Sequence, residues 1–147
     1  MWAGALAGAV LVVDQLTKAW AVNALADGPI VIIEDFLRLR LTHNTGAAFS
    51  LFARSGPVLG LIVIGVIILI VVSLRDAGNL GEAIGLGLVL GGALGNLTDR
   101  VFRGDGLMDG AVVDFIDFSF FPTFNMADSA VTVGVIVLLV STFVLKR

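Results

Sequence analysis

Two aspartates near the C-terminal end of a very hydrophobic chain are the residues best placed to do chemistry. Asp114 stands in the run VVDF (112–115), and Asp128 stands in the run FNMADS (124–129). A carboxylate at a membrane boundary is costly to bury, so each of the two needs a partner or a function. Carboxyl groups on either side of one short loop can meet, and like-charge repulsion then lets the pair share one proton. Such a pair predicts an acid–base hydrolase in which one member activates water and the other polarises a peptide carbonyl.

The same two residues also suit a purely structural role. Asp128 can cap the last helix, because carboxylates are common near helix N-termini, and Asp114 can be a solvated loop acid. Spacing alone favours this structural interpretation. The sequence around the pair must therefore decide between the two roles.

The composition indicates that lipid is the solvent of this chain. The 147 residues are 58% hydrophobic and only 14% charged. A soluble domain of this length cannot hide so much apolar surface. There is no cysteine and only one histidine, His43, so neither thiolate chemistry nor a metal site is expected. The net charge of −3 argues against nucleic acid as a partner.

Four apolar segments predict an all-α membrane protein formed by a single integral membrane domain (1–147). A spanning helix needs about 20 predominantly apolar residues. The segments that meet or approach this requirement are 1–25, 57–74, 83–98 and 129–145. An even number of spans places both termini on one side of the membrane and the long connections, 26–56 and 99–128, on the other. The distribution of Lys and Arg, taken literally, would turn the long connections toward the cytoplasm, and it does not settle the orientation.

The first long connection contains the pattern of a small β-sheet. Leu37, Leu39 and Leu41 alternate with polar residues between them, which is typical of a half-buried strand. The apolar run 30–33 also favours a strand, and a turn signal precedes it at 27–29. We expect this sheet to lie on the membrane surface.

The third span carries polar residues on one helical face. Positions i, i+4, i+7 and i+8 place Gly92, Asn96, Asp99 and Arg100 together. One interpretation has Asn96 and Arg100 orient a polar substrate or the two carboxylates. The other is a packing face that ends in an interfacial Asp99–Arg100 anchor, with glycines that let a neighbouring helix come close.

The first span contains an acid and a base four residues apart. Asp14 and Lys18 are spaced to form an ion pair on one face, and we interpret them first as a structural pair and second as a substrate contact. Asn44 fits either a turn or a site, whereas His43 fits a polar position in the sheet. The remaining acidic residues are interpreted as solvated loop charges, and they are those at 27, 34, 35, 76, 82, 105, 109 and 117.

Five short blocks in order make the chain resemble bacterial lipoprotein signal peptidase, also called signal peptidase II. They are DQLTK (14–18), NTGAAF (44–49), GGALGNLTDR (91–100), VVDF (112–115) and FNMADS (124–129). The resemblance implies an intramembrane aspartic endopeptidase that removes the signal peptide of prolipoproteins just before a diacylglyceryl-modified cysteine. Its catalytic pair falls on Asp114 and Asp128. The family's other motif positions fall on Asp14, Asn44, Gly92, Asn96, Asp99, Arg100, Asn125 and Ala127. From its spacing to Asp14, we add Lys18 to these substrate-binding or supporting residues.

The resemblance also implies a setting for this activity. The protein would be a multi-pass protein of the bacterial cytoplasmic (inner) membrane, with both termini in the cytoplasm and the site near the extracytoplasmic face. Membrane lipid and diacylglyceryl-modified prolipoproteins would be its partners. We expect a monomer that uses no cofactor and no metal.

Two other functional classes fit some of the same residues. A small proton-coupled transporter or channel could use Asp14, Lys18 and Asp128 as a relay, because intramembrane ionisable residues mark proton paths. Transporters, however, often contain internal repeats, and this sequence shows none. A non-catalytic scaffold would explain the glycines but would leave Asn125, Asp128 and Asp114 without a role.

Overall fold

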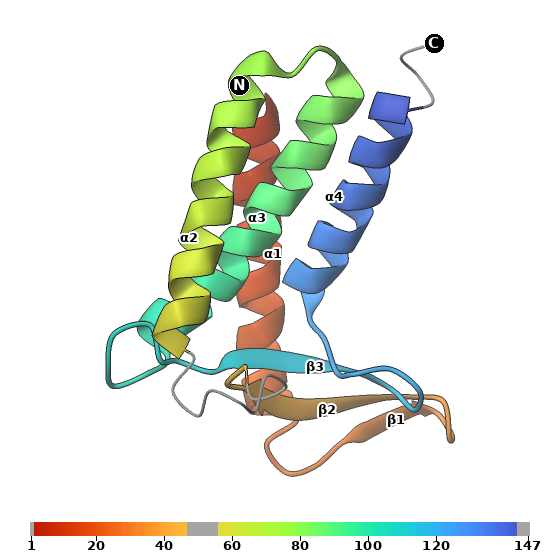
Figure 1. The fold of residues 1–147 in the computed structure, drawn as a ribbon. Coiled ribbons are helices and arrows are strands. Elements are labelled where there is room, and N and C mark those ends of the chain that lie inside the picture. Colours follow the sequence, from red (N-terminus) through yellow and green to blue (C-terminus); the bar gives the residue numbers. More distant parts are fainter. Residues whose placement is uncertain (1, 47–55, 144–147) are drawn as a thin grey trace.

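The computed structural model describes residues 2–46 and 56–143, which form a helical bundle standing on a small sheet (Figure 1). The elements in chain order are α1 (Trp2–Ala24), β1 (Ile30–Ile33), β2 (Leu37–Asn44), α2 (Gly56–Ser73), the short 3-10 helix η2 (Leu74–Asp76), α3 (Leu80–Phe102), β3 (Val112–Phe118) and α4 (Met126–Phe143). Both termini lie at the end of the bundle that is opposite the sheet. The four predicted helices are therefore confirmed.

Helix α3 lies at the centre of the bundle and contacts α1, α2 and α4. All four helices are long and apolar enough to cross a membrane. The third and fourth helices differ from the predicted spans. Helix α3 covers Leu80–Phe102 rather than 83–98, because polar residues at both ends continue the helix beyond the apolar core. Helix α4 begins at Met126 rather than at 129, so Asp128 lies in its first turn.

The sheet has three antiparallel strands in the order β1-β2-β3. The predicted strands in the first connection are present as β1 and β2. The prediction placed the whole sheet in that connection, and this was incomplete: β3 comes from the second long connection and pairs with β2, setting Asp114 opposite Thr42. Asp114 is consequently a strand residue and not a solvated loop acid. An apolar contact attaches the sheet to the bundle. It joins Ala21 of α1 and Leu25, which follows that helix, to Leu39, Leu41 and Phe115.

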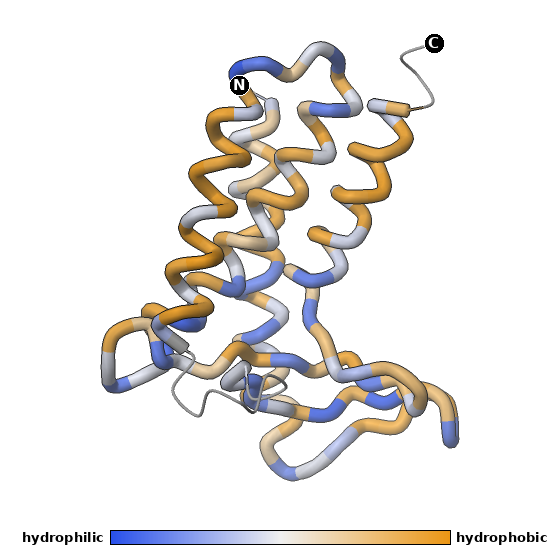
Figure 2. Tube along the Cα trace, in the orientation of Figure 1, coloured by the Kyte–Doolittle hydropathy of each residue, from blue (hydrophilic) through white to orange (hydrophobic). Residues whose placement is uncertain are grey.

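The surface of the helices is suited to lipid. Figure 2 shows that α2 is hydrophobic along nearly its whole length, while hydrophilic residues gather where the helices meet the sheet and at the opposite turn. Large apolar side chains of α2 such as Leu61 and Leu69 are about two-thirds exposed (64% and 66%). In water such exposure would be unfavourable, but lipid tails are as apolar as these side chains. The helices therefore need lipid rather than water around them.

Glycines allow α3 to approach its neighbours on two sides. A Cβ atom at Gly91 would lie 2.6 Å from Val10 Cβ of α1 and 2.8 Å from the carbonyl oxygen of Ala7. A Cβ atom at Gly92 would press on the carbonyl oxygen of Ala127 in α4 and lie 2.6 Å from Cγ2 of Val131. The predicted packing role of these glycines is thus visible in the structure, and Gly92 sets how closely α4 can approach.

Two acidic residues expected to be solvated are buried instead. Glu82 is 8% exposed in the first turn of α3, where its carboxylate accepts a hydrogen bond from the backbone N–H of Gly78 (2.7 Å). Asp117 is 5% exposed in β3 and forms ion pairs with Arg38 and Arg40 of β2. Burial alone would raise the pKa of Asp117, but the hydrogen bonds from the two arginines outweigh it and hold that pKa below its usual value.

Replacing Gly92 by Ala should loosen the contact between α3 and α4. The added methyl group meets a backbone carbonyl, which cannot rotate away, so we expect a loss of about 1–3 kcal/mol in unfolding free energy. Gly65→Ala in α2 is the matched control, because its Cβ would have no heavy atom within 4 Å and alanine is the better helix former. Thermal unfolding in detergent measures both variants. A Gly92→Ala protein as stable as Gly65→Ala would mean that this contact does not limit the packing.

Candidate active site

Asp114 and Asp128 are brought together where the start of α4 meets β3. Asp114 is buried (2% exposed), whereas Asp128 is half-buried. Asn125 contacts both residues. Its side-chain Nδ2 donates to Asp114 Oδ1 (2.7 Å), and its backbone N–H donates to Asp128 Oδ2 (3.2 Å). One asparagine therefore links the two predicted catalytic residues, although Asp114 lies within β3 and not at the edge of a loop.

The start of α4 explains why Asp128 points to this place. Asn125 precedes the helix, and its Oδ1 accepts a hydrogen bond from the backbone N–H of Asp128 (3.0 Å). Asp128 Oδ2 in turn accepts from the backbone N–H of Asn125, so the two residues cap each other reciprocally. The carboxylate also lies at the positive end of the helix dipole. The capping role proposed for Asp128 is real, and it fixes the orientation of the carboxylate.

Each of the two carboxylates receives hydrogen bonds from two asparagine residues. Asp114 Oδ2 accepts from Asn44 Nδ2 (3.1 Å) in addition to the bond from Asn125. Asp128 Oδ1 accepts from Asn96 Nδ2 of α3 (2.8 Å) in addition to the backbone bond from Asn125. The amides of Asn44, Asn96 and Asn125 thus come from β2, α3 and the start of α4. They orient both carboxyl groups without neutralising either one.

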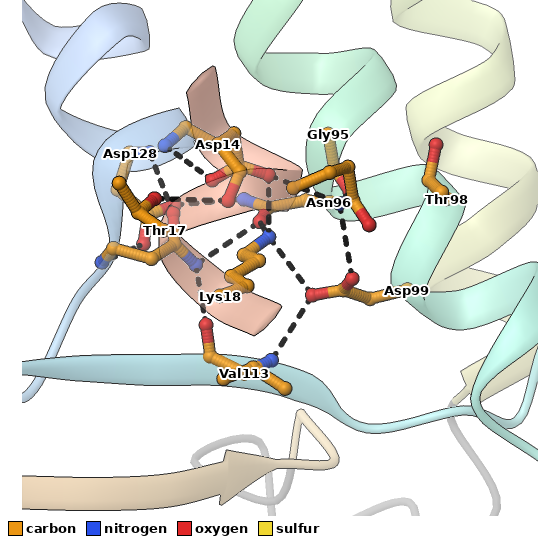
Figure 3. A network of polar contacts seen from close by, with 12 residues as sticks. Asp14, Thr17, Lys18, Gly95, Asn96, Thr98, Asp99, Val113 and Asp128 are labelled. Carbon is orange, nitrogen blue, oxygen red and sulfur yellow. Dashed lines mark hydrogen bonds and ion pairs between the residues drawn. The ribbon is translucent and has the colours of Figure 1, made fainter. Parts of the chain in front are cut away.

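A buried ion cluster of Lys18, Asp14 and Asp99 contacts the amide of Asn96 (Figure 3). Lys18 Nζ lies 2.8 Å from Asp14 Oδ2 and 2.8 Å from Asp99 Oδ2, and all three side chains are 0% exposed. Asp14 Oδ1 accepts from the backbone N–H of Ala127 (2.9 Å), and Asp99 Oδ2 accepts from that of Val113 (3.1 Å). The predicted Asp14–Lys18 ion pair is present, and Asp99 completes it. The cluster joins α1 and α3 to the start of α4 and to β3.

The environment of Asp114 favours its protonated form. Burial, together with the nearby negative charge of Asp128, raises the pKa of Asp114 to about 6, against the hydrogen bonds from Asn44 and Asn125, which lower it. A carboxyl group with such a pKa exchanges its proton close to neutral pH. Two adjacent carboxyl groups of different burial are the arrangement expected for an acid–base pair.

Two further predicted site residues contact neighbours of Asp114 and Asp128 rather than the two aspartates themselves. Gly92 packs against Ala127, and Arg100 donates from Nη1 to the backbone carbonyl of Asn96 (3.1 Å). The Arg100 guanidinium is nevertheless near enough to interact electrostatically with Asp128 and Asp114. Of the predicted block 44–49, residues 47–49 lie outside the described residues. His43 is an exposed residue of β2, as predicted.

Sequence reasoning missed two members of the cluster. Gln15 donates from Nε2 to Asp14 Oδ2 (3.2 Å), to the carbonyl of Gly95 (3.1 Å) and to Asp99 Oδ1 (3.2 Å). Arg103 binds Asp99 Oδ1 through Nε (2.9 Å). A polar residue inside an apolar span was the available signal for Gln15, because such a residue requires a partner in the membrane. Arg103 has no such signal, since it follows the end of the helix.

Two grooves lie along α4, and the first of them borders Asp128. The first, of about 530 Å³, is walled mainly by apolar atoms and opens next to Asp128; it is lined by Phe121, Pro122, Thr123, Phe124, Asp128, Ser129, Thr132 and Val133. The second, of about 350 Å³, lies between α1, α3 and α4 and is lined by Ala9, Val10, Val13, Leu88, Met126, Ser129, Ala130 and Val133. Ser129 and Val133 border both grooves. An apolar ligand can therefore lie beside Asp128 and continue along the helices.

The polar groups of the site are satisfied by one another. Within residues 2–46 and 56–143, no group of three or more His, Asp or Glu side chains is positioned to hold a metal ion. Every buried side-chain nitrogen or oxygen in the same ranges has a hydrogen-bond partner.

Comparison with known proteins gives a consistent set of relatives. The family model described as Signal peptidase (SPase) II matches residues 6–144. The lipoprotein signal peptidase of Rhodococcus jostii (strain RHA1) is 47% identical over 140 residues, which is 95% of this chain and 71% of the relative. That of Mycobacterium avium (strain 104) is 44% identical over 136 residues, covering 92% of this chain and 75% of the relative. A bacterial membrane enzyme solved by the in meso method at 1.9 Å has a TM-score of 0.83 and 31% identity, covering 97% of this chain and 92% of its own.

Removing the Asn44 amide should raise the pKa of Asp114 further. Asn44→Ala deletes one hydrogen bond that favours the ionised carboxylate, so the protonated form persists to higher pH. A hydrogen bond to a charged group is worth about 1.5 kcal/mol, or roughly a tenfold tighter binding of the proton. Carboxyl-selective ¹³C NMR or infrared titration follows the change. Asn23→Ala is the control, since that exposed amide contacts only its own helix at Ala19; equal titrations in the two variants would remove Asn44 from the site.

Proposed function

The chain belongs to the signal peptidase II family of aspartic peptidases, and from this premise we propose that it removes the signal peptide from prolipoproteins. The cut would fall immediately before the diacylglyceryl-modified cysteine, with Asp114 and Asp128 as the catalytic pair. The observation that supports this proposal most is the link through Asn125, which joins the two carboxyl groups where Asp128 borders an apolar groove. A lipid-bearing peptide and a proton-transferring pair would meet at that place.

In the proposed mechanism, Asp128 is the general base and Asp114 the general acid. Asp128, at the positive end of the α4 dipole, takes a proton from water, and the water oxygen bonds to the scissile carbonyl carbon. Asp114 gives its proton to the carbonyl oxygen. Asp128 then protonates the leaving amine of the cysteine, the C–N bond breaks, and Asp114 recovers its proton from the intermediate. The reaction needs no covalent enzyme intermediate.

The contacts around the pair support this division of roles. Asp114 is the more buried residue, and its raised pKa keeps a proton available near neutral pH. Half-buried Asp128 borders the groove of about 530 Å³, where water and substrate arrive. An apolar substrate that covers the groove displaces water and further disfavours double ionisation of the pair. Substrate binding would thus favour the singly protonated, reactive state.

The two grooves along α4 offer places for the apolar parts of the substrate. Acyl chains of the diacylglyceryl group partition into the bilayer and would lie between helices, while the scissile bond rests near Asp128. Asn96, Arg100 and Asn44 surround that position and could hold the peptide backbone. Binding through lipid and backbone would locate the cut without reading many side chains.

The protein is a multi-pass membrane protein, and we propose its orientation. Both termini would face the cytoplasm, and the sheet with the catalytic pair would face the outside of the bacterial cytoplasmic membrane. This orientation fits a signal peptide whose cleavage site emerges on the outer side. The sheet would lie at the lipid surface, where apolar side chains of β1 and half-exposed Arg38 and Arg40 can meet the interface.

Cleavage should depend on both aspartates and on the lipid. Purified protein in detergent or lipid is incubated with a diacylglyceryl-modified prolipoprotein, and a gel shift reports the cut. We expect Asp114→Asn and Asp128→Asn each to lose at least about a thousandfold in rate while remaining folded, because each amide removes one proton-transfer group. Asp105→Asn, in an exposed connection, should cleave normally.

Specific results would contradict this function. Near-normal cleavage by either catalytic variant would exclude that aspartate from the mechanism. Equal cleavage of the unlipidated precursor would exclude recognition of the diacylglyceryl group. If folded wild-type protein cleaves neither substrate, the peptidase activity itself is wrong for this chain.

The orientation can be tested because the chain contains no cysteine. Asp105→Cys lies in the connection between α3 and β3, and Ala77→Cys lies between η2 and α3 at the opposite end of the bundle. We expect a membrane-impermeant maleimide to label only Asp105→Cys in intact cells with a permeable outer envelope. Lysed cells supply the control, since both variants should then react. Labelling of only Ala77→Cys in intact cells would reverse the orientation.

A further inference from the structure

The amide of Asn96 lies between a buried lysine and a catalytic carboxylate. Its Oδ1 accepts a hydrogen bond from Lys18 Nζ (3.0 Å) and another from Asn125 Nδ2 (3.1 Å). Its Nδ2 donates to Asp128 Oδ1 (2.8 Å). An ammonium group has only donors, so the amide atom that faces Lys18 must be oxygen. The NH₂ group of Asn96 consequently faces Asp128.

We propose that Lys18 is a positioning residue for catalysis that acts through Asn96 on Asp128. Lys18 does not contact the reacting atoms; it fixes the Asn96 amide so that its NH₂ group always points to Asp128 Oδ1. With the backbone N–H of Asn125 on Oδ2, both oxygens of Asp128 are then held, and the carboxylate keeps one face toward the groove. The proposal rests on the proposed peptidase function, in which Asp128 must present that face to water.

The surroundings of Lys18 make it rigid enough for this role. Its Nζ contacts Asp14, Asp99 and Asn96 at 2.8, 2.8 and 3.0 Å, which uses its three N–H bonds. The side chain is 0% exposed, so no water competes for these bonds. Moving the ammonium group away would leave two buried carboxylates with fewer partners, which is unfavourable. Lys18 therefore stays in place, and Asn96 stays with it.

The amide of Asn96 connects Lys18 to Asp128. Lys18 and Arg103 carry two positive charges, and Asp14 and Asp99 carry two negative charges. Burial raises the pKa of Asp114, and the positive charge of Lys18 acts in the opposite direction on that residue. The directed contact with Asn96 is the route from Lys18 to Asp128.

The test uses a variant that preserves the charge balance. Lys18→Met alone leaves Asp14 without its cation, and it can unfold the protein. Lys18→Met combined with Asp14→Asn removes one charge of each sign and leaves Asp99 paired with Arg103. An asparagine at 14 still offers an oxygen to the backbone N–H of Ala127. Arg38→Gln is the matched control, because it also removes a cation from a buried aspartate, Asp117, but lies outside the ion cluster.

Cleavage kinetics of the lipidated precursor separate positioning from folding. For the folded double variant we expect kcat to fall at least about tenfold while KM stays within about twofold, since Asp128 loses a fixed donor and the grooves are unchanged. Arg38→Gln should keep both values. A folded double variant with the kcat of the wild type would overturn the proposal, and so would an equal loss in Arg38→Gln.

A second measurement does not depend on activity. The protein is labelled with ¹⁵N-asparagine, and the side-chain NH₂ signals of Asn96 are compared between wild type and variants. We expect two resolved signals in the wild type and in Arg38→Gln, and shifted or exchange-broadened signals in the double variant. Unchanged signals in the double variant would overturn the role of Lys18. If wild-type protein cleaves no prolipoprotein, the proposed function fails, while these signals still decide the positioning.

Discussion

The neutralisation of one buried lysine is the interaction on which the rest of this structure depends. A lone ammonium group within a helical bundle in lipid is strongly unfavourable, so Lys18 requires negative partners at fixed positions. Asp14 supplies one carboxylate from the preceding turn of the same helix, and Asp99 supplies a second carboxylate from α3. Both carboxylates also accept backbone N–H groups, at Ala127 and Val113. Satisfying one charge thus fixes the relative positions of two helices, the start of a third and a strand.

The positions of Asp114 and Asp128, the proposed catalytic pair, depend on the elements that this ion cluster holds together. Asparagine is suited to the task because an amide can bind a fixed donor with its oxygen and a carboxylate with its nitrogen. Asn44, Asn96 and Asn125 each accept a hydrogen bond at Oδ1 and each donate through Nδ2 to Asp114 or Asp128. Cations in these positions would neutralise the carboxylates and suppress proton transfer. Amides orient the carboxyl groups and lower the pKa of Asp114 only in part, so that burial still raises it.

Much of this arrangement could be predicted from the sequence, and the missing parts have physical reasons. Long apolar segments identify helices in lipid because the bilayer imposes their length. The i, i+4 spacing identified the Asp14–Lys18 pair, but Asp99 belongs to another helix, and local periodicity carries no information about that contact. The run VVDFIDF around Asp114 has few turn signals, and its strand is specified by pairing with β2, which is 70 residues away in the chain at Asn44. Asp117 seemed solvated because its partners Arg38 and Arg40 are equally remote.

The division of the pair between a strand and a helix has a consequence for biogenesis. Asp114 precedes α4 in the chain, whereas Asp128 lies within it, and the first turn of α4 is held by Asp14 of α1. Helix α1 is synthesised before α4, so Asp14 can hold the first turn of α4 only once α4 has been made. With the proposed catalytic pair, a nascent chain without α4 has Asp114 but lacks Asp128, and it has no hydrolytic competence. The order of synthesis would then keep the peptidase inactive until α4 has been inserted.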